Sequence, residues 1–443
     1  ISEITANGHP YEHSELFNRD YLINSCTHAA NLYYNGKVAG WTIDLNADWQ
    51  KGEESYGSRY NEQSESFESR ERSSQNYIHN DLWAAKLVLE HELFGGKLTV
   101  GAEYTHTDRK DDYINPEGFV PTTYTVLKDR GISPFVEYSI PLPFGQLQAG
   151  VRYEAIQFDY FSNGVHQQEQ SRSFHNWFPS VSLATQLGKV QAMLSAGVKT
   201  RRPTYRELRG NVSYINRFTL QTGNPYLKPS TLYDVALQLQ WKCWSFKVNY
   251  NDTRDAVLNF ATQKPGQESV TVLGYQNFKS YKQLNVQWVA APQIGKWRPQ
   301  FGVVMLKPWL KLETASETLH FNRPIFAVMC NNSFQFTPTF FGDCTLQFTS
   351  KGEQQNARMD RATCTVSASL TKTFLKDRLS LKVGVSDIFR TRESVVLFNH
   401  QMNIAQTNLY DSRHFDLTLR YSFNATSNKY KGTGAGNAEK QRL

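Results

Sequence analysis

Apolar and polar residues alternate with a period of two along strand-length segments, from near residue 30 to residue 423. The clearest segment starts at Asp234, and its apolar set is Val235, Leu237, Leu239 and Trp241. Successive side chains of a strand point to opposite faces, so each segment has one apolar face and one polar face. A barrel in a bilayer needs this arrangement, because its outer face meets lipid and its inner face meets water. The pattern therefore predicts an all-β fold, a transmembrane antiparallel β-barrel.

Composition favours a barrel over membrane-spanning helices. The chain has 443 residues. It contains no proline-rich stretch, no glycine/serine-rich stretch and no run of like charges that could act as a linker, which indicates one large unit. Its mean hydropathy is negative, and it has no run of about 18 apolar residues. Only helices and closed barrels satisfy every backbone hydrogen bond within lipid. Aromatic residues make up 13% of the chain, which suits girdles at the two membrane interfaces, although large soluble sandwiches are aromatic-rich too.

Reversals of two lengths alternate along the chain. The short ones lie at Asn35-Gly36, 94–96, 141–145, 187–189, Lys242-Cys243, 294–296, 337–339 and Lys376-Asp377. The long polar connections lie at 51–75, 109–128, 159–174, 202–231, 253–269, 313–323, 351–360 and 388–410. Outer-membrane barrels have this asymmetry, and their short turns face the periplasm. The predicted location is therefore the cell outer membrane, with outer-membrane lipid as the partner of the apolar face.

These turns and their flanking segments give about 17 strands, the last of which runs from His414 to Phe423. An even-numbered barrel whose last strand ends in the periplasm requires an odd number of further strands before residue 30. The sequence also begins without an initiator methionine or signal peptide, so we expect a fragment of a barrel of about 22 strands. Residues 1–424 are then the C-terminal portion of the barrel. Residues 425–443, which are polar, glycine-containing and basic, are expected to form a periplasmic tail.

Three separated motifs resemble one family. Residues 200–208 read TRRPTYREL and are followed by GNPYLKP at 223–229; VSDIF stands at 385–389, and YSF at 421–423 precedes KGTGAGN at 431–437. These motifs and their order on the predicted strands resemble the outer-membrane β-barrel family of Bacteroidetes TonB-dependent receptors. The resemblance implies an N-terminal plug and a TonB-contacting segment outside this sequence, and hence a TonB-type energy-coupling complex as a partner. A surface lipoprotein is a further partner that it implies.

The first motif permits two interpretations. Pro203 removes a backbone donor where the preceding strand ends, and Gly223-Asn224-Pro225 is turn chemistry, so both stretches could simply shape one extracellular loop. Alternatively, cationic and aromatic side chains of this loop form a rim that binds an anionic or sugar-like ligand. The candidate ligand-binding residues are Arg201, Arg202, Tyr205, Arg209, Tyr214 and Arg217.

Catalytic and metal-binding patterns are weak. The sequence has no GxSxG, no HExxH and no phosphate-cradling glycine loop, so we expect no enzyme and no cofactor. The five cysteines are an odd number without CxxC spacing, which argues against a disulfide framework or a zinc site. Asp108, Asp111 and Asp112 could bind calcium, but Arg109 and Lys110 between them favour a solvated loop. The net charge of +7 has no clustered basic stripe, so no nucleic-acid partner is expected.

The leading hypothesis is a TonB-dependent receptor that takes up a scarce solute, such as an oligosaccharide, a peptide, a siderophore or another metal chelate. Mixed charges on the predicted inner face, among them Arg152, Glu154 and Glu103, suit a barrel packed against a polar plug. The alternative is a passive porin, or an adhesion or assembly barrel without energy coupling. A secreted all-β protein is disfavoured, because a soluble protein would not expose an apolar face on strand after strand.

Overall fold

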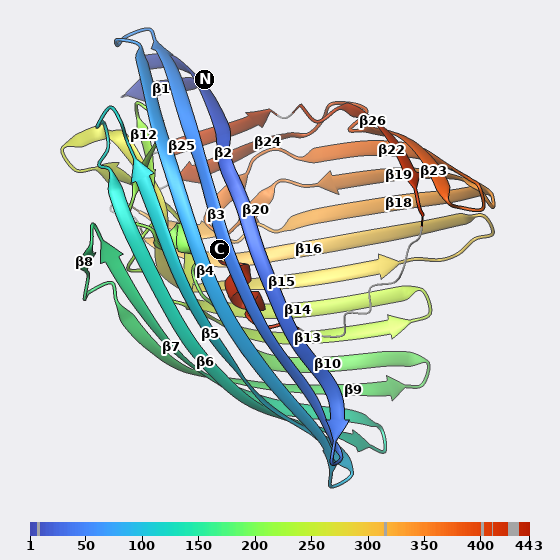
Figure 1. The fold of residues 1–443 in the computed structure, drawn as a ribbon. Helices are drawn as coiled ribbons and strands as arrows, with labels where there is room; N and C mark the ends of the chain where they lie inside the picture. Colours follow the sequence, from blue (N-terminus) through green and yellow to red (C-terminus); the bar gives the residue numbers. More distant parts are fainter. Residues whose placement is uncertain (7–8, 314–316, 400–402, 410, 424–433) are drawn as a thin grey trace.

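The computed structural model describes residues 1–6, 9–313, 317–399, 403–409, 411–423 and 434–443. A single sheet of 22 strands dominates these residues, and a second sheet of four short strands adjoins it. Seventeen strands of the large sheet are consecutive neighbours along the chain and pair antiparallel; we call them the wall (Figure 1). The predicted all-β antiparallel fold and the predicted number of strands are confirmed.

The wall strands are β2 (His9–Val38), β3 (Trp41–Ser64), β4 (Arg70–Leu93), β5 (Gly96–Ile114), β6 (Thr123–Leu142), β7 (Gly145–Ser162), β9 (Arg172–Leu187), β10 (Val190–Arg201), β13 (Ser230–Trp241), β14 (Trp244–Lys264), β15 (Gln267–Ala290), β16 (Trp297–Glu313), β18 (Ile325–Thr337), β19 (Phe340–Thr349), β22 (Thr363–Phe374), β23 (Leu379–Ser386) and β26 (His414–Tyr421).

The other elements lie in the long connections or at the chain ends. Five short strands complete the large sheet: β1 (Ser2–Ala6), β8 (Val165–His166), β11 (Val212–Asn216), β12 (Thr219–Thr222) and β17 (Thr318–Phe321). The second sheet contains β20 (Gly352–Gln354), β21 (Ala357–Met359), β24 (Glu393–Asn399) and β25 (Asn403–Leu409). The described helices are α1 (Tyr205–Leu208) and α2 (Asn437–Lys440). Both are far too short to cross a membrane, as is true of every helix in the described residues.

The predicted faces agree with the structure. In the β13–β14 ladder Leu237 lies opposite Val248, and Gln238 lies opposite Lys247, so apolar pairs alternate with polar pairs. Large apolar side chains remain exposed on strand after strand. Examples are Tyr104, Ile132, Val181, Leu194, Val235, Leu237, Val303, Val328, Leu370 and Val383. Such a continuous apolar outer surface is what a membrane-embedded wall requires.

The turns and loops differ from the sequence prediction in two respects. The first reversal is at Ala39-Gly40, both with positive φ, instead of Asn35-Gly36, because Asn35 pairs with Asp44 inside the β2–β3 ladder. Much of the predicted connections at 51–75, 109–128 and 253–269 is strand, since the hairpins continue well past the apolar belt. Asp108, Asp111 and Asp112 accordingly lie on β5, and the described residues contain no group of side chains placed to hold a metal ion.

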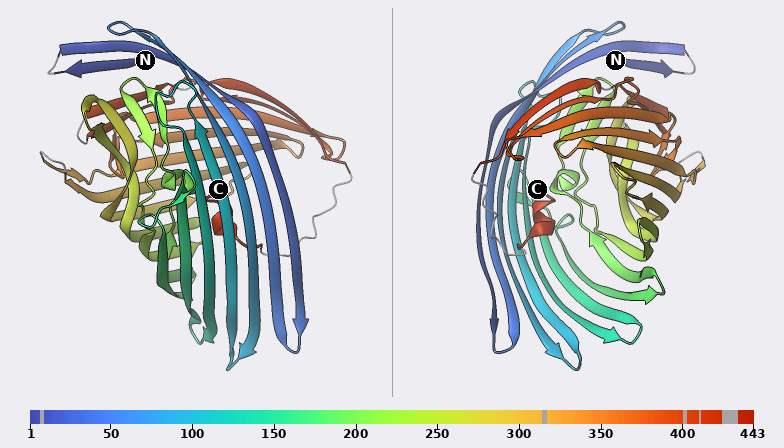
Figure 2. Two further views of the ribbon diagram at one scale, coloured as in Figure 1. Left: turned by 60° about the vertical axis from the view of Figure 1, so that its left-hand side comes forward. Right: turned by 90° about the vertical axis from the view of Figure 1, so that its right-hand side faces the viewer.

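The wall curves around an interior without closing. Figure 2 shows the first wall strands and the last ones approaching each other around this interior. Among the described residues, no ladder joins β2 to β26. The buried apolar core is correspondingly not central. It forms clusters at the loop ends of the strands, and one of them packs Leu127, Phe158 and Val257 against Tyr205 and Leu208 of the α1 connection.

The C-terminal segment lies inside the wall, which corrects one prediction. Residues 425–443 were expected to form a tail in the periplasm, and residues 424–433 lie outside the described part of the chain. Gly434–Leu443, however, lies against the concave face of the wall, where the marker of the C-terminus stands in Figure 2. The expectation failed because a barrel interior is itself polar, so a polar segment can be bound there as well as in bulk water.

Candidate functional site

The first motif builds a single helical turn at the loop end of the wall. The β10 strand ends at Arg201, and α1 follows directly after Thr204. The Glu207 backbone nitrogen donates to Thr204 Oγ1 (3.2 Å), and the Thr204 nitrogen donates to Glu207 Oε2 (2.7 Å). This reciprocal capping box satisfies donors that a four-residue helix cannot satisfy internally. The turn then places Tyr205, which has no exposed surface, in the apolar cluster beneath it.

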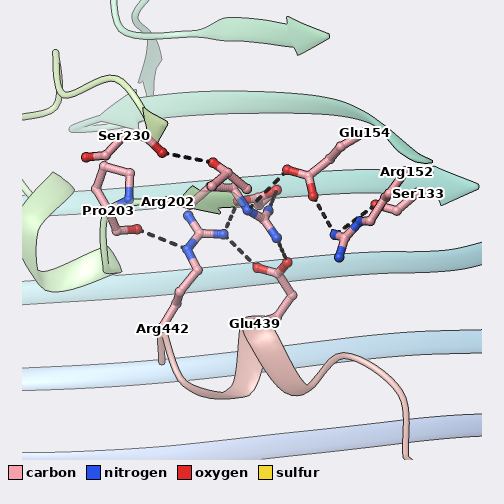
Figure 3. A network of polar contacts seen from close by, with 10 residues as sticks. Ser133, Arg152, Glu154, Arg202, Pro203, Ser230, Glu439 and Arg442 are labelled. Atoms are coloured by element: carbon pink, nitrogen blue, oxygen red, sulfur yellow. Dashed lines mark hydrogen bonds and ion pairs between the residues drawn. The ribbon is translucent and has the colours of Figure 1, made fainter. Parts of the chain in front are cut away.

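A network of buried charges surrounds this turn on the concave face (Figure 3). Arg202 lies 3.5 Å from Asp129 Oδ1 and 3.8 Å from Glu154 Oε1, and it donates to Glu439. Arg442 Nη1 donates to Asp129 Oδ2 and to Glu439 Oε2, both at 2.6 Å. The members come from β6, β7, the β10–α1 junction and the C-terminal segment. Burial makes unpaired charges costly, so the near balance of guanidinium and carboxylate groups is what permits the network to lie here.

Ionisation in the network follows from these neighbours. Burial alone would lower the pKa of Arg442, but the neighbouring carboxylates of Asp129 and Glu439 outweigh burial and hold this pKa above its ordinary value. Burial has the opposite effect on Tyr205, because the charged form of tyrosine is the deprotonated one, and it raises the pKa of the Tyr205 phenol. The Arg442 guanidinium also lies over the Tyr205 ring, with Cζ 4.5 Å from the ring centroid. Arg442 therefore remains a cation and Tyr205 remains neutral at any physiological pH.

A cavity of about 600 Å³ adjoins the network and is lined by more cations than anions. Arg152, Lys199 and Arg201 line it with side chains that are 41%, 66% and 54% exposed. Each of the three has a carboxylate neighbour, yet each keeps much of its donor capacity toward the cavity. Glu154 is the acidic residue among the lining side chains. The cavity is thus suited to an anionic group.

The structure divides the six predicted ligand-binding residues into two groups. Arg201 and Arg202 precede α1, and Tyr205 is its first residue. Arg209 caps the C-terminal end of α1, and its Nη1 lies 3.7 Å from Asp111 Oδ2. The second group is at β11, where the Tyr214 hydroxyl donates to Glu62, and the Arg217 backbone nitrogen donates to Glu62 Oε1 at 3.0 Å. Tyr214 is additionally packed edge-on against two aromatic rings in a buried cluster.

Arg201 differs from the other five residues in its exposure. Arg202, Arg209 and Arg217 have side chains that are 9%, 12% and 6% exposed, and both tyrosines are buried. Their polar and aromatic groups largely serve to hold the connection between β10 and β13 in place, in line with the loop-shaping interpretation. Arg201 alone of the six presents a half-exposed charge to the 600 Å³ cavity.

Sequence reasoning missed several residues of this site. Asp129 and Glu154 carry the buried negative charge, and Lys199 is the most exposed cation of the cavity. Glu439 and Arg442 belong to the segment that was expected to lie elsewhere. Alternation placed Glu154 on the inner face, and the same rule could have placed Asp129 there. Nothing in the sequence pairs Asp129 with Arg442, which is 313 positions away.

The second motif, VSDIF at 385–389, forms a separate polar turn after β23. Asp387 accepts hydrogen bonds from the backbone nitrogens of Thr391 (3.1 Å) and Arg392 (3.0 Å) and from the Ser412 hydroxyl. Burial alone would raise the pKa of this carboxyl, but the bonds from Ser412, Thr391 and Arg392 lower it below the ordinary aspartate value. The carboxylate therefore fastens two loop segments on either side of β24 and β25, and its role is structural.

The fold resembles solved outer-membrane structures at low sequence identity. The copper transporter OprC matches with a TM-score of 0.61 and 12% identity over 90% of this chain and 72% of that chain. The ferric-catecholate import receptor Fiu from E. coli matches with a TM-score of 0.59 and 13% identity over 90% of this chain and 64% of that chain. The alcaligin outer-membrane receptor FauA from Bordetella pertussis matches with a TM-score of 0.51 and 13% identity over 93% and 67%. A comparison with curated proteins finds no match.

An antiparallel wall with an apolar outer face and a charged inner face defines an integral β-barrel of the outer membrane. The sequence matches the Outer membrane protein beta-barrel family over residues 35–421, and the chain belongs to that family. Its predicted location in the outer membrane, its predicted barrel fold and its likeness to receptor barrels are thereby confirmed. The family consists of membrane barrels, and the chain is not an enzyme.

Proposed function

We propose that the chain is the barrel of an outer-membrane receptor that takes up a scarce solute and is driven by a TonB-type energy-coupling complex. Family membership and the likeness to transporters and import receptors support this proposal. The concave face supports it further, because a network of buried charges and an ordered segment lie there, whereas a passive pore is lined by hydrated groups. A surface lipoprotein that covers the loop end would fit the same function.

The observation that carries the solute class is the charge of the cavity beside α1. Arg152, Lys199 and Arg201 present three half-exposed cations to about 600 Å³ of space. Charge-assisted hydrogen bonds to carboxylate or phosphate oxygens are stronger than neutral ones. We therefore propose that the solute carries an anionic group, as acidic peptides, uronic-acid oligosaccharides and many metal chelates do. The sugar-like alternative would rely on stacking, but Tyr205 is buried and cannot offer its face to the cavity.

The test compares three anionic probes with neutral counterparts: a ferric tricarboxylate chelate, an acidic tripeptide and a uronic-acid trisaccharide. Binding to the full-length receptor in detergent is measured by calorimetry, for the native chain and for Lys199→Gln combined with Arg201→Gln. Each lost charged hydrogen bond is worth about 1.5–3 kcal/mol, so the double variant should bind the anionic probe at least about tenfold more weakly.

Lys247→Gln is the matched control, because Lys247 is an exposed cation of the inner face outside the cavity. It should leave the affinity unchanged. Uptake into cells separates the receptor from the passive alternative: it should stop when the proton-motive force is dissipated. Uptake that continues undiminished, or equal binding of charged and neutral probes, would contradict the proposal.

A further inference from the structure

The segment Gly434–Leu443 is bound along the wall from near its middle to the α1 turn. The backbone nitrogens of Gly434, Ala435 and Gly436 donate to Asn46 Oδ1 (3.1 Å), to the Asp48 carboxylate and to Glu103 Oε1 (2.8 Å). Three consecutive donors thus meet three acceptors on β3 and β5. Successive backbone N–H groups around residues with positive φ form a concavity that suits carboxylate oxygens.

The two glycines are needed for this contact. Gly434 and Gly436 have φ of 73° and 67°, a region that other residues rarely adopt. A Cβ on Gly436 would lie 2.7 Å from the Ala84 Cβ, so the backbone lies directly on the wall. Ala435 has no exposed surface. The sequence Gly-Ala-Gly is therefore fitted to the wall in both shape and hydrogen bonding.

The charges of the segment are complementary to the wall. Lys440 Nζ lies 3.4 Å from Asp48 Oδ1, Glu439 accepts from Arg202, and Arg442 donates to Asp129. Arg442 Nε also donates to the Pro203 carbonyl at 3.0 Å. Each charged side chain of the segment thus meets an opposite charge on the wall or at the β10–α1 junction. Such complementarity determines register and partner, because a shifted segment would bring like charges together.

The end of the segment reaches the α1 turn and its apolar cluster. The Tyr205 nitrogen donates to the Arg442 carbonyl (3.3 Å), and Arg109 Nη1 donates to the Leu443 oxygen (3.2 Å). The Leu443 side chain packs against the cluster beneath α1. TRRPTYREL and the GAGN stretch at 434–437, which belongs to the last motif, are thereby parts of one contact. Ala438, Gln441 and Arg442 form one side of the cationic cavity.

We propose that this strip of the inner wall is a peptide-binding site, and that Gly434–Leu443 is its tethered, displaceable occupant. The site recognises a Gly-x-Gly backbone followed by a helical turn with an acidic residue and an arginine three positions apart. The contacts of the segment are mainly hydrogen bonds and ion pairs, and its apolar contacts are those of Ala435 and Leu443. An element held by few apolar contacts can open locally without unfolding the remainder. Release of the segment would open one side of the cavity and free the carboxylates of Asp129 and Asp48.

The test is whether the segment binds in trans. The full-length receptor is compared with a variant lacking Gly434–Leu443, and a fluorescein-labelled peptide of these ten residues is titrated in detergent while its anisotropy is measured. A short tether gives an effective concentration of about 1 mM, so a peptide with a Kd of about 10 μM should bind the native chain about 100-fold more weakly than the truncated one. A peptide with Glu439→Ala and Arg442→Ala is the control and should not bind either receptor.

A second variant covers the case in which the truncated receptor does not fold. The full chain with Glu439→Ala and Arg442→Ala keeps its length but loses the contacts that anchor the segment, and it should bind the labelled peptide more tightly than the native chain does. Equal affinities for the native chain and these variants would overturn the proposal. So would the absence of binding to a truncated receptor that remains folded by circular dichroism.

Discussion

A charge introduced at Leu237 tests which face of the wall meets lipid. Leu237 is 37% exposed and lies on β13 midway between Tyr233 and Trp241, two exposed aromatics on the same face. It is four positions from each of them, about 14 Å along the strand at 3.4 Å per residue. With a strand tilt of about 40°, the two aromatics are about 21 Å apart along the membrane normal, close to the height of a lipid-facing apolar band. Leu237 then lies near the bilayer midplane.

Leu237→Arg should therefore lower the free energy of unfolding from the membrane by about 2–4 kcal/mol. Ala236→Arg is the matched control, because Ala236 is the next residue on the strand, points to the inner face and lies opposite Asn249 and Ser195. Its cost should stay below about 1 kcal/mol, as expected for a surface substitution that meets no opposed like charge. The difference corresponds to at least about fivefold in the folding equilibrium.

Both values can be measured by guanidinium titration of the receptor folded in phosphatidylcholine vesicles, with tryptophan fluorescence as the signal. Equal costs at the two positions would show that the wall does not separate lipid from water as described. A larger cost at Ala236 would show that the faces are reversed.

Three further predictions concern the ends of the wall. Tyr421 and Phe423 stack at the end of the last strand with ring centroids 6.1 Å apart. Because interfacial aromatics anchor a barrel, replacing both by Ala should lower the abundance of the receptor in the outer membrane several-fold. Normal abundance of the variant in membrane fractions would refute this. Asp387 has a lowered pKa, so its loop contacts should be fully present above the ordinary aspartate pKa and lost as pH falls through the lowered pKa. Proteolysis of residues 388–410 should therefore be faster in acid. In the Asp387→Asn variant the rate of this proteolysis should not depend on the ionisation of residue 387 and should be the same at every pH. A Cβ at Gly145 would lie 2.1 Å from the Ala184 carbonyl oxygen, so Gly145→Ala should reduce the yield of folded receptor. The yield is measured as the fraction of an unheated sample that migrates as folded barrel on a denaturing detergent gel. Gly95→Ser, with open space around the residue, should reduce that yield less.

The wall could be predicted from the sequence because the alternation that produces its strands is a local property of each segment. Each strand carries its own alternation, so the faces of β13 and β14 and the turn at Lys242-Cys243 follow from neighbouring residues alone. The number of wall strands follows from the number of such segments. None of this depends on knowing which distant residues come into contact.

The ends of the strands were less predictable, since they depend on the pairing of two whole strands. Asn35-Gly36 has the sequence of a tight hairpin, yet the β2–β3 register places the turn four residues later, at Ala39-Gly40. The ladder extends from Val38 opposite Trp41 to Ser14 opposite Ser64, and many pairs together outweigh the preference of one dipeptide. Polar stretches were interpreted as loops for a related reason: outside the lipid, paired strands need no apolar face.

The charged network shows where sequence reasoning about a site ends in a barrel. Arg202 was selected as a cation free to meet a ligand, but Asp129, Glu154 and Glu439 already neutralise it. Composition cannot reveal this, because in a barrel the same polar character describes a periplasmic tail, a solvated lumen and a buried ion network. The distinction depends on desolvation: a charge buried on the inner wall must be paired, whereas a charge in bulk water need not be. The segment at 434–443 contains Gly-Ala-Gly, with Glu439 and Arg442 three residues apart. Its role could be inferred only from the structure, which places the partners of these residues opposite them.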